Sequence, residues 1–81
     1  VFLYGAHWCR HCEDAESHMK TRSIGYTYRD VDQADASQEL AIKLRAAGQK
    51  DGAIPVEDVD GDLLVGWSAQ RFDQVYDAKV R

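Results

Sequence analysis

Basic residues, cysteines and long apolar runs are all scarce in this chain of 81 residues, and each shortage excludes a class of protein. Ten scattered Lys and Arg against fourteen Asp and Glu leave a net charge of −4, which argues against a nucleic-acid-binding protein. No apolar run approaches the ~18 residues of a membrane-spanning helix. Two cysteines are too few for a domain held together by several disulfides. We therefore predict a soluble globular domain whose cysteines serve chemistry.

The chain starts directly on the strand-like run Val1–Tyr4 and carries no initiating Met. We interpret residues 1–81 as one domain, excised from a longer polypeptide or left after processing, and expect it to be a monomer. Whether the parent chain has a targeting segment or a membrane tether stays open.

Apolar periodicity and turn signals predict the element order β-α-β-α-β-β-α. The first β-α-β unit should be parallel and right-handed, and Asp60-Gly61 between two apolar runs predicts an antiparallel hairpin. Gly48 stands where a C-terminal helix cap is expected, and Ser68 stands where an N-terminal cap is expected. The predicted strands are 1–4, 26–31, 54–59 and 63–67, and the predicted helices are 9–22, 34–47 and the segment after Ser68.

The motif Cys9-Arg10-His11-Cys12 carries the functional prediction. Cys9 follows a strand and begins a helix, and CxxC in that context is typical of a redox motif. Backbone N–H groups at a helix N-terminus stabilise a thiolate, the form that attacks disulfides. We expect Cys9 to be exposed and nucleophilic, and Cys12 to be shielded and to resolve the mixed disulfide. Arg10 and His11 should favour the thiolate, so we expect a potential more oxidising than about −270 mV.

A CxxC pair can also form half of a zinc site, and His7, His11 and His18 are further candidate ligands. Zinc requires four convergent N or S ligands, whereas His18 should point to a different side of the helix from Cys12. We therefore predict no metal site. The alternative to an enzyme is a redox-sensing or metal-binding module of a larger protein, in which the dithiol switches a partner contact or holds a metal.

Pro55 is the single proline, and its strand is expected to lie beside the first strand. It is compatible with the simple start of an edge strand. The functional interpretation is a cis bond packed against the CxxC motif, with the Ile54 backbone free to pair with an extended substrate. Because only about 5–6% of X–Pro bonds are cis, the residues alone favour the trans form.

Four segments of the chain follow one another as in a known family. They are Tyr4-Gly5-Ala6-His7-Trp8-Cys9-Arg10-His11-Cys12, Ile54-Pro55-Val56, Val59-Asp60-Gly61-Asp62 and Gly66-Trp67-Ser68. With them the chain resembles a glutaredoxin-type member of the thioredoxin-fold superfamily. The resemblance implies a four-stranded mixed sheet flanked by three helices, a cis Pro55 beside the dithiol, and exchange with protein disulfides or glutathione-mixed disulfides. The residues that it implies in substrate binding are Trp8, Ile54, Pro55, Gly66 and Trp67. Trp67 could equally fill the edge of the core.

The chain departs from the glutaredoxin pattern at two places. Glutaredoxins usually carry Pro-Tyr between the cysteines, whereas Arg10-His11 stands here, and a His before the second Cys is similar to periplasmic disulfide oxidases. The segment Val65–Gln70 lacks the Gly-Gly and acidic cluster that holds glutathione in glutaredoxins. It is similar to glutaredoxin-like electron donors of ribonucleotide reductase, which thioredoxin reductase serves.

These departures leave the electron donor and the compartment open. We expect no bound cofactor, and either glutathione or thioredoxin reductase as the donor. Acidic charge and the lack of structural disulfides favour the cytoplasm, which is our expectation, whereas the His before the second Cys favours the periplasm or another oxidising compartment. A third interpretation, the amino-terminal half of a glutathione transferase with a similar Ile-Pro-Val strand, is weakened by the CxxC motif.

Overall fold

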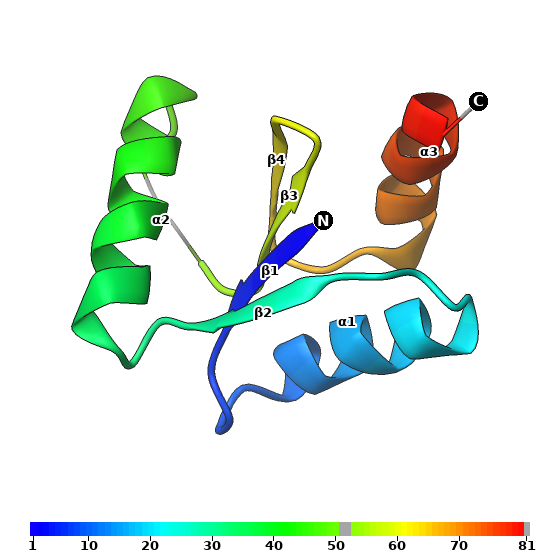
Figure 1. Cartoon of the computed structure of the whole chain (residues 1–81), viewed down its shortest axis with the longest axis horizontal. Coiled ribbons are helices and arrows are strands. Elements are labelled where there is room, and N and C mark those ends of the chain that lie inside the picture. The colour runs from blue at the N-terminus through cyan, green and yellow to red at the C-terminus, as the bar shows by residue number, and fades with distance from the viewer. Residues whose placement is uncertain (51–52, 81) are drawn as a thin grey trace.

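The computed structural model describes residues 1–50 and 53–80, which form four strands and three helices (Figure 1). In chain order they are β1 (Phe2–Gly5), α1 (Arg10–Thr21), β2 (Thr27–Asp30), α2 (Ala34–Ala46), β3 (Val56–Val59), β4 (Asp62–Val65) and α3 (Ala69–Val80). This order is the predicted one. None of the described helices is long and apolar enough to cross a membrane.

The strands form one mixed sheet in the order β2-β1-β3-β4. As predicted, β1 runs parallel to β2, and β3 lies beside β1, with Tyr4 opposite Val56 in an antiparallel pair. β3 and β4 form the predicted antiparallel hairpin. Because β1 and β3 run in opposite directions, the residues that follow β1 and the residues that precede β3 meet at the same end of the sheet.

Helices cover both faces of the sheet, with α2 on one side and α1 and α3 on the other (Figure 1). Leu3 and Tyr4 are both fully buried, and they point to opposite faces because successive side chains of a strand alternate. The cluster on the α1/α3 face contains Leu3, Ala15, Met19, Ile24, Val59, Leu64 and Phe72. The cluster on the α2 face contains Tyr4, Leu40 and Val56. β1 is therefore the doubly buried central strand that its apolar run predicts.

Two turns have the geometry that their residues predict. Asp60 and Gly61 have φ angles of 51° and 97°, as a two-residue hairpin turn with both central residues at positive φ requires. Gly48, with a φ of 73°, follows α2 and donates its N–H to the carbonyl of Arg45. The next N–H, from Gln49, bonds to the carbonyl of Leu44, which completes a Schellman cap.

Several elements are shorter than predicted. β3 begins after Pro55 because proline has no N–H to give to the ladder. β4 ends before Gly66, whose φ of 83° turns the chain away while its N–H donates to the carbonyl of Pro55 at 2.8 Å. α1 begins at Arg10 because Cys9 is its N-cap, with extended backbone angles of −97° and 113°. Ser68 caps α3 as predicted, since its Oγ accepts the N–H of Arg71.

Candidate active site

The CxxC motif lies at the N-terminus of α1, where β1 ends and β3 begins. As the N-cap residue, Cys9 places its side chain at the open end of the helix, and its Sγ accepts the N–H of Cys12 at 3.3 Å. The Cys9 N–H is itself bound to the carbonyl of Ala6 at 3.1 Å, which fixes the approach loop. A sulfur in this position receives the partial positive charge of the helix N-terminus, which stabilises a thiolate.

Both cysteines are more buried than the sequence suggests. The expectation that Cys9 is exposed is wrong, because the residue is only 8% exposed and packs against Ala6 and Ile54. Cys12 is 1% exposed, so the predicted difference between the two holds. Burial, together with the neighbouring Cys9, raises the pKa of the Cys12 thiol to about 12. Cys12 is therefore a protonated thiol at neutral pH.

Cys12 has space because position 5 of the adjacent strand is glycine. A Cβ atom at Gly5 would lie 2.9 Å from the Cys12 Sγ and 3.0 Å from the Cys12 Cβ, which is closer than side chains pack. It would also lie 3.4 Å from a ring carbon of Tyr28. Gly5 is a residue that the sequence analysis missed as part of the site. Its signal was a glycine at the end of a buried strand, just before the motif.

Ile54 and Pro55 come to the dithiol from the start of β3. The Ile54–Pro55 peptide bond is cis, and the carbonyl oxygen of Ile54 lies 4.0 Å from the Cys9 Sγ. Ile54 is half-buried against the cysteines, while the Pro55 side chain is fully buried. The CxxC motif and the Ile54–Pro55 segment, which the sequence predicts to be neighbours, therefore lie together.

Arg10 and His11 lie on the surface beside the motif. Nδ1 of His11 is 3.9 Å from a carboxylate oxygen of Asp14, and within the described part of the chain neither side chain hydrogen-bonds to a cysteine sulfur. Their influence on the thiolate stays a prediction. Trp8, which precedes Cys9 in the sequence, is 72% exposed. Its Nε1 donates a hydrogen bond to the Asp32 carboxylate at 2.9 Å, which fixes the indole ring.

Trp67 packs on the core and not around the cysteines. The centre of its ring lies 5.4 Å from the centre of the His18 ring and 5.6 Å from that of the Phe72 ring, and Trp67 packs against the core cluster of the α1/α3 face. The structure thus favours the core-edge alternative for Trp67.

Gly66 is connected to the site indirectly, through its hydrogen bond to the carbonyl of Pro55. His18 pairs with Asp73 at 2.8 Å.

The sequence analysis also missed Glu57 in β3. Its side chain is 1% exposed, and its Oε2 has no hydrogen-bond partner among residues 1–50 and 53–80. Burial raises the pKa of Glu57 to about 8, although the charge of Arg71 acts in the opposite direction. The available signal was a carboxyl group in a strand expected to lie beside the buried first strand.

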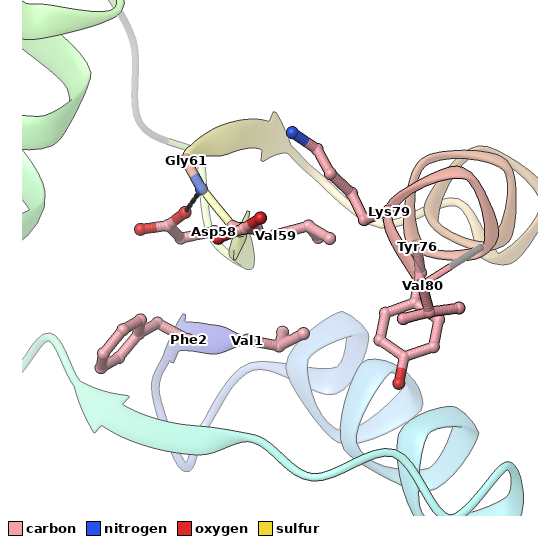
Figure 2. Close-up of a pocket in the computed structure, with 9 residues that line it drawn as sticks. Val1, Phe2, Asp58, Val59, Gly61, Tyr76, Lys79 and Val80 are labelled. Atoms are coloured by element: carbon pink, nitrogen blue, oxygen red, sulfur yellow. Dashed lines mark hydrogen bonds between the residues drawn. The ribbon is translucent and has the colours of Figure 1, made fainter.

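Other candidate sites do not coincide with the dithiol. Figure 2 shows a pocket at the opposite end of β1, between Val1 and Phe2, the turn at Gly61, and Tyr76 and Lys79 of α3. It contains neither cysteine. Across the described residues, no three His, Cys, Asp or Glu side chains are grouped so that they could hold a metal ion.

Comparisons with known proteins agree with this geometry. The family model described as Glutaredoxin matches residues 1–62. The chain is 25% identical over 75 residues to an uncharacterized glutaredoxin-like 8.6 kDa protein in the rubredoxin operon of Clostridium pasteurianum, covering 93% of this chain and 95% of that protein. The crystal structure of a glutaredoxin from Archaeoglobus fulgidus has the same fold, with a TM-score of 0.75 at 14% identity, covering 91% of this chain and 82% of that one. The predicted thioredoxin fold is confirmed.

Proposed function

Because this chain belongs to the glutaredoxin family, we propose that it is a dithiol–disulfide oxidoreductase that reduces protein disulfides or glutathione-mixed disulfides. The observation that carries the proposal is the position of Cys9. Its Sγ lies at the N-terminus of α1 and accepts the N–H of Cys12 at 3.3 Å, a position in which helix N–H groups face the sulfur that attacks.

The reaction proceeds in two displacements. The Cys9 thiolate attacks a substrate disulfide, a bond forms between Cys9 and one substrate sulfur, and the other sulfur leaves and takes a proton from water. The Cys12 sulfur then attacks the Cys9 Sγ, and the bond between Cys9 and the substrate breaks. The substrate gains two electrons and the protein is left with a Cys9–Cys12 disulfide. Burial assigns the second step to Cys12, whose thiol is the less accessible of the two.

The surroundings of Cys9 suit an extended peptide. The half-buried Ile54 packs against the cysteines and its carbonyl lies 4.0 Å from the Cys9 Sγ, while Trp8, which precedes Cys9 in the sequence, exposes an indole ring. We propose that substrate lies across these two residues, with its disulfide over Cys9. Trp67, which packs on the core, is left out of this surface.

The oxidised pair must be reduced again by an external donor. We propose that a thioredoxin reductase, and not glutathione, reduces the Cys9–Cys12 disulfide, because the segment after β4 reads Gly66-Trp67-Ser68 and lacks the acidic cluster that would hold glutathione. Coupled assays with each donor separate the two. Turnover with glutathione alone would contradict this choice of donor and leave the exchange chemistry intact.

Trapping the mixed disulfide tests the proposed roles. The variant Cys12→Ser should retain a stable adduct of Cys9 with a disulfide-bonded peptide, visible as one added mass by mass spectrometry. The matched variant Cys9→Ser should form no adduct at neutral pH, because the Cys12 thiol is buried and its pKa is about 12. Adduct formation at Cys12, or at neither residue, would overturn the proposal.

A further inference from the structure

Glu57 is a buried carboxyl group that the exchange mechanism above leaves without a role. It lies in the middle of β3, on the face of the sheet that α1 and α3 cover, because it is directly opposite Leu3 of that core cluster. Apart from this carboxyl and the Cys12 thiol, the buried side chains of that face are apolar. Within the part of the chain that the structure describes, its Oε2 has no hydrogen-bond partner, and burying such an atom costs stability, so its presence calls for a reason.

The register of the sheet places Glu57 next to the thiol of Cys12. Tyr4 pairs with Val56 and Leu3 pairs with Glu57, so Gly5 continues the row opposite Pro55. The Cys12 sulfur rests directly on Gly5. Glu57 and Gly5 are thus diagonal neighbours on one face, a separation of about 7–8 Å between backbones that a Glu side chain, alone or with one bridging water, spans. In agreement with this proximity, an ionised Glu57 raises the pKa of Cys12.

Few other titratable groups face this carboxyl. α1 contributes Cys12, and α3 contributes Arg71, whose exposed charge lowers the pKa of Glu57 against the larger effect of burial. The sheet contributes Tyr28 of β2, a phenol whose pKa is raised to about 12 by burial and the nearby thiols. The register neighbours Leu3 and Leu64 are apolar. Cys12 is thus the proton donor in reach that changes its state during exchange.

We propose that Glu57 is the internal base that takes the proton of Cys12 when Cys12 resolves the mixed disulfide, an inference that rests on the proposed function. The proton passes from the Cys12 thiol to the Glu57 carboxylate, and the resulting thiolate attacks the Cys9 Sγ. The bond between Cys9 and the substrate sulfur breaks, that sulfur leaves as a thiolate, and Glu57 later returns its proton to water. Electrons move only among the sulfurs.

The burial of Cys12 explains why an internal base is needed. The residue is 1% exposed, so water and hydroxide have little access to its proton, and a thiol with a pKa of about 12 is almost wholly protonated at neutral pH. Glu57, with a pKa of about 8, is ionised in part of the molecules at neutral pH and in most of them above pH 8. A base positioned in this way accelerates proton transfer by about 10²–10⁴-fold in enzymes.

Stopped-flow reaction of the reduced protein with a limiting amount of dithiobis(nitrobenzoate) separates the two steps. The attack of Cys9 releases the first coloured thiolate, and resolution by Cys12 releases the second. We expect Glu57→Gln to leave the first phase within about twofold and to slow the second by about a hundredfold at pH 8, near the lower end of the effect of a positioned base. The second phase of the natural protein should level off above about pH 8, while that of the variant keeps rising.

Two further variants separate this role from a structural one. Asp58→Asn removes the neighbouring carboxyl of β3, which faces α2, and should leave the second phase and its pH profile unchanged. Glu57→Asp restores a carboxyl and should recover the levelling of the pH profile. A second phase that is equal in Glu57→Gln and the natural protein would overturn the role of Glu57 alone. Absence of the first phase in the natural protein would overturn the proposed function as well.

Discussion

Glu57 and Asp58 are adjacent carboxyl groups of β3 that face opposite sides of the sheet, and their surroundings differ completely. Asp58 faces α2, where it accepts a 2.7 Å hydrogen bond from the Lys43 ammonium and a 2.8 Å bond from the Gly61 N–H. Although burial acts to raise it, these partners hold the pKa of Asp58 below its ordinary value. Glu57 faces α1 and α3 with its Oε2 unpartnered among the described residues, and its pKa rises to about 8.

A similar contrast holds for the polar groups that lie nearest to these two carboxyls. On the α2 face, polar groups are paired: the Tyr4 hydroxyl and the Arg29 Nε both donate to Glu39. On the α1/α3 face, the buried polar groups beside the active site are a protonated thiol and a carboxyl whose Oε2 has no hydrogen-bond partner among the described residues. Buried polar groups that have hydrogen-bond partners contribute to stability, whereas buried polar groups without partners reduce it. We conclude that the paired polar groups of the α2 face add to stability, whereas the polar groups next to the reacting sulfurs on the opposite face reduce it, although the larger apolar cluster lies on that face.

The largest expected effect on stability comes from removing the charge of Glu57. The folded state binds the Glu57 proton more tightly than the unfolded chain, where the pKa of Glu is about 4.3. Between that value and about pH 8 the folded state therefore holds more protons, and stability falls as the pH rises. Urea unfolding of the natural protein should show a loss of about 3–5 kcal/mol over this range that Glu57→Gln does not show.

The neighbouring carboxyl provides the control for that measurement. Asp58→Asn should keep the loss of stability between pH 4.5 and pH 8, because Glu57 is still present. If the natural protein and Glu57→Gln have parallel pH profiles, then Glu57 is not buried as a titrating carboxyl, and the contrast between the two faces fails.

A smaller effect is expected on the α2 face. Lys43→Met keeps most of the aliphatic stem that packs near the Phe2 and Tyr4 rings but leaves Asp58 without its cation, and should cost about 2 kcal/mol at pH 7. Because the folded pKa of Asp58 is lowered, the ion pair is fully present above the unfolded value of about 3.9 and is lost as the pH falls through the folded value.

Urea unfolding at pH 7 and below pH 4 measures this difference. Lys20→Met, on an exposed lysine of α1 with no ion pair among the described residues, is the matched control and should stay within about 0.5 kcal/mol of the natural protein. Disulfide exchange by Lys43→Met should be unchanged within about twofold. A loss of exchange activity would show that the α2 face is not purely structural.

The smallest expected effect on stability is that of Gly5→Ala. The new methyl group would overlap the Cys12 side chain, so the start of α1 must shift, at a cost of about 1 kcal/mol after the gain from replacing a strand glycine. The same shift should slow resolution by Cys12 more than attack by Cys9. Gly25→Ala, where nothing lies within 4 Å, is the control. If Gly5→Ala has the same unfolding midpoint and the same resolution rate as the natural protein, then a glycine at position 5 is not needed to accommodate the Cys12 side chain.

Local signals were sufficient to predict most of the fold. The alternation and turn chemistry of Asp60-Gly61, the cap at Gly48 and the position of CxxC after a strand each act over a few residues, and all three were predicted. Element ends were less well predicted, and not all of them have a local cause. The end of β4, for example, involves a bond from the Gly66 N–H to the Pro55 carbonyl, which joins the residue after β4 to the residue before β3.

The site was only partly predictable for the same reason. The two cysteines and Pro55 stand in a recognisable motif, but the burial of Cys9 depends on packing against Ile54, which is distant in sequence. The contact between Gly5 and Cys12 and the proximity of Glu57 follow from the register of β1 and β3. The sequence signal for Glu57 was a carboxyl group in a strand that is expected to pair with the buried first strand.

The most direct test of the central claim is the reduction potential of the Cys9–Cys12 pair. The protein would be equilibrated against glutathione buffers of graded ratio, and the free thiols counted by mass spectrometry. Dithiol exchange predicts an intramolecular disulfide with a potential between about −270 and −120 mV, the range of known dithiol oxidoreductases. Two free thiols that persist in the most oxidising buffer, with no intramolecular disulfide, would contradict the account.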